Sequence, residues 1–156
     1  MTMERRDDFM KLYQKWQNLT PGQRAELRRV NNPCGLLEVP AFYRLFSGMG
    51  SKEWEKDAYQ RLIFCLPCIE GHTEQPVSLG AALAKKRDGG RPVVSEKRLF
   101  QVVRSNAPND LIQLRRILKM AEPVVNWPRT AETLWYWNDR SKRDLLEHYF
   151  INNQTN

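Results

Sequence analysis

Residues 95–128 constrain the fold most strongly, because they hold two consecutive segments with the 3.6-residue periodicity of an amphipathic helix. In the first segment one side is apolar, made of Leu99, Phe100, Val102 and Val103, and the other carries Lys97, Gln101 and Arg104. In the second, the apolar stripe is Leu111, Leu114, Ile117, Leu118 and Ala121, and the opposite side is predicted to carry Arg115, Arg116 and Lys119. Two helices of this kind predict a surface suited to a long polyanion.

Helical signals continue along the rest of the chain. Residues 7–19 repeat apolar side chains at helical spacing, and Thr20-Pro21-Gly22-Gln23 predicts a capping box that starts a second helix. Further helices are predicted over 40–46, 52–66 with Ser51 as the cap, 79–84 after Ser78, 127–137 after Asn126, and from Ser141 onward. No alternating run of strand length occurs, so the predicted class is all-α, a compact bundle of about eight to nine helices.

We expect a single all-helical domain over residues 1–156. The polar segment 70–76 contains Gly and Pro and is the expected boundary between an N-terminal lobe, 1–70, and a C-terminal lobe, 76–156. Four side chains on the apolar stripes are predicted to be core, namely Trp16, Phe64, Leu114 and Leu118. In the run 135–137, Trp137 is expected to pack between the last two helices, whereas Tyr136 is compatible with packing or with base stacking.

The positive charge is concentrated in one part of the chain. The formal net charge is +7, and residues 85–119 hold ten Lys or Arg against three carboxylates. These residues therefore carry the whole excess, including the glycine-containing segment 85–91, which is expected to be a mobile basic loop. Such a distribution favours a focused anion-binding face over general solubility, although a solvated basic surface without a partner is the alternative.

Candidate chemistry is sparse. Cys65 and Cys68 form one CxxC pair with His72 beyond it, but a structural zinc site draws its ligands from two such pairs, and Cys65 lies inside an apolar run. We therefore expect buried reduced thiols and no metal. The two histidines have no nucleophile or acid beside them in the sequence, and no phosphate-binding glycine motif occurs. The sequence indicates no catalytic residues, no cofactor and no enzyme.

The sequence also carries no targeting signal. No apolar run approaches the roughly 20 residues of a membrane span, and the first residues lack an apolar core and a small-residue cleavage site. We expect a cytoplasmic protein.

At QLRRILKMAEPVVNWP (113–128) the chain resembles the small subunit of the type I-E Cascade CRISPR surveillance complex, the CasB family. The similarity extends outward to Leu99-Phe100-Gln101 with Arg104, SLGAALA (78–84), FCL (64–66), VPAFYRL (39–45), RRV (28–30) and the N-terminal Leu12-Tyr13 with Trp16. Motifs in one order across nearly the whole chain are far more specific than any single one.

The resemblance implies a non-catalytic, all-helical protein that assembles as a pair along the belly of the complex. Its implied partners are the backbone subunits that hold CRISPR RNA, the large subunit, a second copy of itself, and the target and displaced DNA strands of the R-loop. The implied nucleic-acid-binding residues are Arg28, Arg29, Arg44, Arg104, Arg115, Arg116, Lys119 and Arg140. For Arg44, a contact with a neighbouring protein subunit is the alternative. Asp139 stands where a second basic residue is expected beside Arg140.

Two other functions agree with the same features. A free DNA-binding regulator needs a recognition helix that offers Arg, Gln or Asn to base edges, and residues 110–121 offer Gln113 and two arginines. A purely architectural subunit would direct the basic face at an acidic protein surface.

Overall fold

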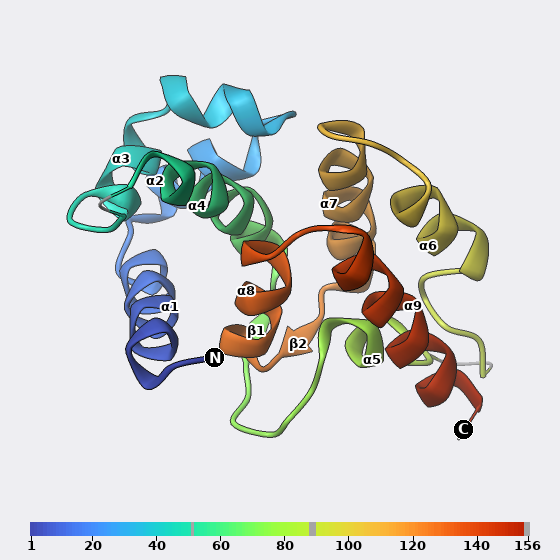
Figure 1. Ribbon diagram of the computed structural model, residues 1–156. Coiled ribbons are helices and arrows are strands. Elements are labelled where there is room, and N and C mark those ends of the chain that lie inside the picture. The colour runs from blue at the N-terminus through green and yellow to red at the C-terminus, as the bar shows by residue number, and fades with distance from the viewer. Residues whose placement is uncertain (51, 88–89, 155–156) are drawn as a thin grey trace.

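The computed structural model describes residues 1–50, 52–87 and 90–154, and in this part of the chain it is predominantly helical (Figure 1). The all-α prediction is confirmed. The α-helices are α1 (Met3–Gln17), α2 (Pro21–Arg28), α3 (Pro40–Phe46), α4 (Glu53–Cys65), α5 (Leu79–Leu83), α6 (Glu96–Val103), α7 (Asn109–Ala121), α8 (Trp127–Trp135) and α9 (Asp139–Gln154). Two 3₁₀ turns, η1 (Pro33–Glu38) and η2 (Leu66–Cys68), and two short strands, β1 (Gly71–His72) and β2 (Val124–Val125), complete the described elements.

The helices form two groups with α8 between them. Figure 1 shows α1–α4 on one side and α5, α6, α7 and α9 on the other. Helix α8 packs against α1 and α4, while α5 packs along α9 and α6 along α7. One continuous cluster of buried apolar side chains runs through both groups. The division into lobes 1–70 and 76–156 stays a prediction.

The segment expected to separate the lobes contains β1, which pairs in parallel with β2 through Gly71 and Val124. Two further backbone bonds extend this contact, from Glu70 N–H to Pro123 O and from Thr73 N–H to Val125 O, both 2.9 Å long. Residues about fifty positions apart are thereby joined at the centre of the molecule.

Three helices begin at the capping residues that the sequence predicts. Thr20 and Gln23 form the capping box, with Thr20 Oγ1 accepting from the Gln23 N–H and Gln23 Oε1 from the Thr20 N–H. Side chains of Ser78 and Asn126 also accept at their predicted caps, and Ser95 caps α6 in the same way. Each cap supplies an acceptor to a backbone N–H that has no partner within the helix.

Three starts differ from the prediction. Helix α1 begins at Met3 rather than near Asp7, because Thr2 already caps it by accepting from the Arg5 N–H. The last helix begins at Asp139 rather than Ser141, because Asn138 Oδ1 accepts the Ser141 N–H at 3.0 Å. Helix α4 has Lys52 at its N-cap without a side-chain bond, and Ser51, the predicted cap, lies outside the described residues.

The predicted core is confirmed. Trp16, Phe64, Leu114 and Leu118 are all buried, as is Cys65. Helices α5 and α9 are in very close contact at Gly80, where an added Cβ would stand 2.5 Å from Leu145 O. Helix α5 can approach α9 so closely only because residue 80 has no side chain. In the described part of the chain no helix is long and apolar enough to cross a membrane.

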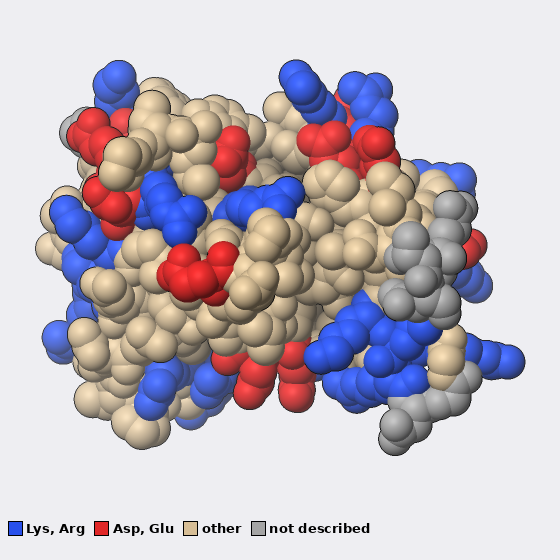
Figure 2. Space-filling model, turned by 90° about the horizontal axis from the view of Figure 1, so that it is seen from below, with Lys and Arg blue, Asp and Glu red and all other residues tan. Residues whose placement is uncertain are grey.

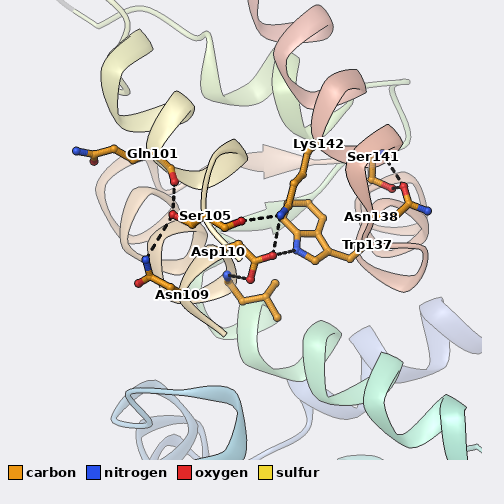
Figure 3. A network of polar contacts seen from close by, with 9 residues as sticks. Gln101, Ser105, Asn109, Asp110, Trp137, Asn138, Ser141 and Lys142 are labelled. Carbon is orange, nitrogen blue, oxygen red and sulfur yellow. Dashed lines mark hydrogen bonds and ion pairs between the residues drawn. The ribbon is translucent and has the colours of Figure 1, made fainter. Parts of the chain in front are cut away.

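A buried polar network ties the start of α7 to α9 (Figure 3). Lys142 Nζ lies 2.9 Å from Asp110 Oδ2 and donates to Ser105 O at 2.9 Å. Asp110 also accepts from the indole N–H of Trp137 at 2.9 Å and from the Leu111 N–H at 2.8 Å. The carboxylate is thus paired with an ammonium and hydrogen-bonded, which is what a buried charge needs to be tolerated.

We predict that Lys142→Met lowers the free energy of unfolding by about 3–5 kcal/mol, because it leaves the Asp110 carboxylate buried without its counter-ion. Arg143→Met is the matched control, since Arg143 is exposed on the same helix and its loss should change stability by less than about 0.5 kcal/mol. Urea denaturation of both variants measures the difference. Equal midpoints would show that the pair does not stabilise the contact between α7 and α9.

Candidate nucleic-acid interface

The eight predicted cationic side chains do not form one surface. Seven are exposed, namely Arg28, Arg29, Arg44, Arg104, Arg116, Lys119 and Arg140, and Arg115 is buried. They belong to five helices or their caps: α2, α3, α6, α7 and α9. Figure 2 shows one face of the molecule, on which Lys and Arg gather most densely at the lower right while Asp and Glu separate other basic groups.

Two of the predicted residues meet in one groove. Arg28 from α2 and Lys119 from α7 line an open groove of about 590 Å³, together with Arg24, which is not among the predicted residues. Its other lining side chains are Tyr13, Trp16, Gln17, Pro67, Cys68, Ile69, Glu70 and Glu122. We call this the α2–α7 groove. It contains three cationic and two acidic side chains, so its excess charge is positive but modest.

The Arg28 side chain is positioned by contacts on two sides. Its guanidinium carbon lies 5.5 Å from the centre of the Trp16 ring, and Nε donates to Pro67 O over a long 3.5 Å. A guanidinium over an indole face is attracted by the ring quadrupole and keeps donors for a further partner. Arg28 is therefore held in the groove without having its hydrogen-bonding capacity exhausted.

The prediction that Arg115 is an outward-facing cation is wrong. Arg115 is 3% exposed, and its Nη2 donates to Leu27 O at 2.9 Å and to Arg28 O at 2.7 Å. The guanidinium lies over the Phe64 ring at 4.6 Å. Arg115 follows Leu111 by one turn, so it stands at the edge of the apolar stripe, and α2 and α4 pack against that edge.

Arg115 is buried because it binds carbonyl groups at the C-terminal end of α2. The last carbonyl groups of a helix lack partners within it and form the negative end of its dipole. Arg115 supplies both a donor and a positive charge to that end. Its Nε and Nη1 are also buried and have no hydrogen-bond partner among the described residues. Arg115 thus contributes to the groove from beneath, by fixing the backbone of Arg28.

Two other basic side chains also donate to carbonyl oxygens at or just beyond the ends of helices. Arg61 donates to Leu134 O at 2.8 Å and to Trp135 O at 2.7 Å, at the end of α8. Lys15 donates to Ser47 O at 2.7 Å, beyond the end of α3. These bonds were not predictable from the sequence, because no local feature distinguishes a cation that reaches a distant helix end from one in solvent.

The CxxC pair is buried beside the groove. Burial raises the pKa of the Cys68 thiol, and Arg115 acts in the opposite direction without reversing the shift. Burial also raises the pKa of Cys65 far above its usual value. Both thiols are therefore kept neutral. In the described ranges no group of three or more His, Cys, Asp or Glu side chains is placed to hold a metal ion.

The remaining predicted cations lie outside the groove. Arg104 covers the Phe100 ring at 4.8 Å and lines a shallow depression with Lys97. Arg44 is exposed on α3, and Arg140 lines a cleft beside Tyr136. In the predicted basic loop, Lys86 and Pro92 form an antiparallel bridge, and residues 88 and 89 lie outside the described part.

Sequence comparison with known proteins matches this chain to one family over most of its length. The sequence profile of the family described as CRISPR-associated protein Cse2 matches residues 23–150. The Cascade subunit CasB of Escherichia coli strain K12 is 38% identical over 162 aligned residues, which cover 96% of each chain.

Solved structures agree with the sequence match. One chain of the crystal structure of E. coli Cascade bound to a PAM-containing double-stranded DNA target superposes with a TM-score of 0.85 at 38% identity, covering 94% of this chain and 97% of that one. CasB from Thermus thermophilus shares the fold, with a TM-score of 0.69 at 16% identity over 97% and 99% of the two chains.

We predict that Arg115→Met destabilises the fold by about 1–3 kcal/mol, because it removes the guanidinium donor from Leu27 O and Arg28 O at the end of α2. Arg116→Met is the control, since the neighbouring side chain is exposed and its removal should cost less than about 0.5 kcal/mol. Urea denaturation compares the two. If Arg116→Met costs as much as Arg115→Met, the assignment of Arg115 to the interior is wrong.

Proposed function

This chain belongs to the family of the CRISPR-associated protein Cse2, and we propose that it is a non-catalytic subunit of a Cascade surveillance complex that stabilises the R-loop through contacts with nucleic-acid backbone. In this proposal it assembles in the cytoplasm with the backbone subunits that hold CRISPR RNA, with the large subunit and with a second copy of itself. Its nucleic-acid partners are the target and displaced strands. The E. coli relative is a Cascade subunit, and a chain of a DNA-bound Cascade structure shares the fold.

The observation that carries the proposal is the meeting of Arg24, Arg28 and Lys119 in the α2–α7 groove. These cations come from segments about ninety residues apart, so the groove exists only in the folded chain. Lys and Arg bind phosphate without reading bases, and a subunit that serves any guide sequence needs contacts of that kind. Glu70 and Glu122 also line the groove and would repel phosphate, so the three cations supply the attraction for a strand.

A few contacts with backbone phosphates are sufficient to change the stability of an R-loop. R-loop formation exchanges a DNA duplex for an RNA–DNA duplex of similar stability, so the balance is set by supercoiling and by protein contacts with the backbone. Each phosphate contact adds an attraction that weakens with salt. A groove with two or three cations can therefore prolong the open state without selecting a sequence.

The surroundings of His72 support a role without catalysis. His72 Nδ1 accepts the Trp127 N–H at 3.0 Å, and Nε2 lies 2.9 Å from Glu74 Oε1. Nδ1 thus joins β1 to the start of α8, and Nε2 is engaged by a carboxylate of its own segment. A histidine held in this way has no nitrogen available as a general base.

We predict that the double substitution Arg28→Gln and Lys119→Gln weakens binding of single-stranded DNA and shortens R-loop lifetime in the assembled complex. For every phosphate that the protein no longer neutralises, the slope of log affinity against log salt should flatten by about 0.7. The weakening should be similar for unrelated sequences, and the subunit should still copurify with the complex. The charge-matched control is Lys52→Gln with Arg143→Gln, two exposed cations that do not line the groove.

Three results would contradict the proposal. If the groove variant leaves the complex, the groove is a protein interface and the architectural function is correct. If its salt slope and R-loop lifetime equal those of the control, the backbone contacts lie elsewhere. A discrete protected site on random duplex DNA would favour a sequence-specific regulator.

A further inference from the structure

The turn between α8 and α9 presents one aromatic ring to solvent, while the ring before it is buried and the ring after it is half-buried. Trp135 is buried in the core, and Trp137 directs its indole N–H at Asp110. Tyr136, between them, is 55% exposed. Among the described residues, no aromatic ring or cationic group stacks on Tyr136, so its ring is available to a ligand.

The backbone that carries Tyr136 is held on both sides. The Tyr136 N–H donates to Glu132 O at 3.1 Å, and the Ser141 hydroxyl donates to Tyr136 O. Asn138 caps α9, and Figure 3 shows Asn138 and Ser141 together, with Trp137 directed at Asp110 and Lys142. An aromatic ring on a fixed turn loses little conformational freedom when a ligand stacks on it, which favours binding.

The cleft beside the ring has a balanced charge. It has a volume of about 550 Å³, and its lining includes two guanidinium groups, Arg129 and Arg140, and two carboxylates, Glu132 and Asp144. Arg129 Nη1 already donates to Pro76 O at 2.7 Å. A phosphate would meet repulsion as well as attraction here. An uncharged, flat group with both donors and acceptors fits the lining better.

From this geometry we propose that the Tyr136 cleft binds an unpaired nucleobase of the displaced DNA strand, stacked on the phenol ring. The inference rests on the proposed function, because the displaced strand is the part of an R-loop whose bases have no partner. The carboxylates can accept hydrogen bonds from base amino groups, the Asn138 amide N–H groups can donate to base acceptors, and Arg140 can approach an adjacent phosphate. Any of the four bases can stack on an aromatic ring, so the contact is compatible with any target sequence.

The test measures R-loop lifetime in the assembled complex, with intact displaced strand and with blocks of that strand replaced by abasic nucleotides. Tyr136→Ala should shorten the lifetime by about 5- to 150-fold, and Tyr136→Phe should retain it within about twofold, because the ring provides the stacking. The effect of Tyr136→Ala should disappear when the block that reaches the cleft is abasic. The salt slope should not change, since the substitution removes no cationic group.

The outcomes separate this inference from the proposed function. If groove variants at Arg28 and Lys119 shorten the R-loop lifetime while Tyr136→Ala does not, the base site is refuted and the proposed function stands. An equal effect of Tyr136→Ala on intact and fully abasic displaced strands would also refute it. If Tyr136→Ala releases the subunit from the complex, the ring contacts another protein chain and the inference is wrong.

Discussion

The contact between Arg115 and the end of α2 joins two helices whose bonded residues lie 88 and 87 positions apart in the sequence. One nitrogen donates to two carbonyl oxygens, and the guanidinium rests on Phe64 from α4. Three helices are thereby fixed around one charged group. The α2–α7 groove depends on this contact, because it sets the position of the Arg28 backbone relative to α7, which carries Lys119.

The same principle applies elsewhere in the molecule. Helix ends leave carbonyl oxygens without partners, and a small all-α protein has many such ends close to its core. Arg61 and Lys15 reach the carbonyls at the ends of α8 and α3, and Lys142 reaches Ser105 O while it pairs with Asp110. Part of the basic character of the chain therefore stabilises the fold. The cations left exposed, such as Arg28 and Lys119, are those that can contact a polyanion.

A structural feature could be predicted from the sequence where it depends on neighbouring residues, and could not where it depends on distant ones. Helix periodicity and the cap at Thr20 act over a few residues, so the class, several helix starts and the buried positions such as Leu114 were predictable. The family was predictable for a different reason: several motifs in one order carry more information than any one. The burial of Arg115 was not predictable, because it depends on which distant helix end packs beside it. The groove was only partly predictable for the same reason: Arg28 and Lys119 were chosen individually, and only the folded chain shows that they meet.

The central proposal is that nucleic-acid backbone follows the α2–α7 groove while Arg115 stays beneath it. The most direct measurement is a cryo-electron microscopy structure of this subunit in a Cascade complex with a complete R-loop. We expect phosphate oxygens within hydrogen-bonding distance of Arg28 and Lys119, with Arg115 still bonded to the carbonyls of Leu27 and Arg28. A groove filled by another protein chain, or an Arg115 side chain turned out to contact phosphate, would contradict the proposal.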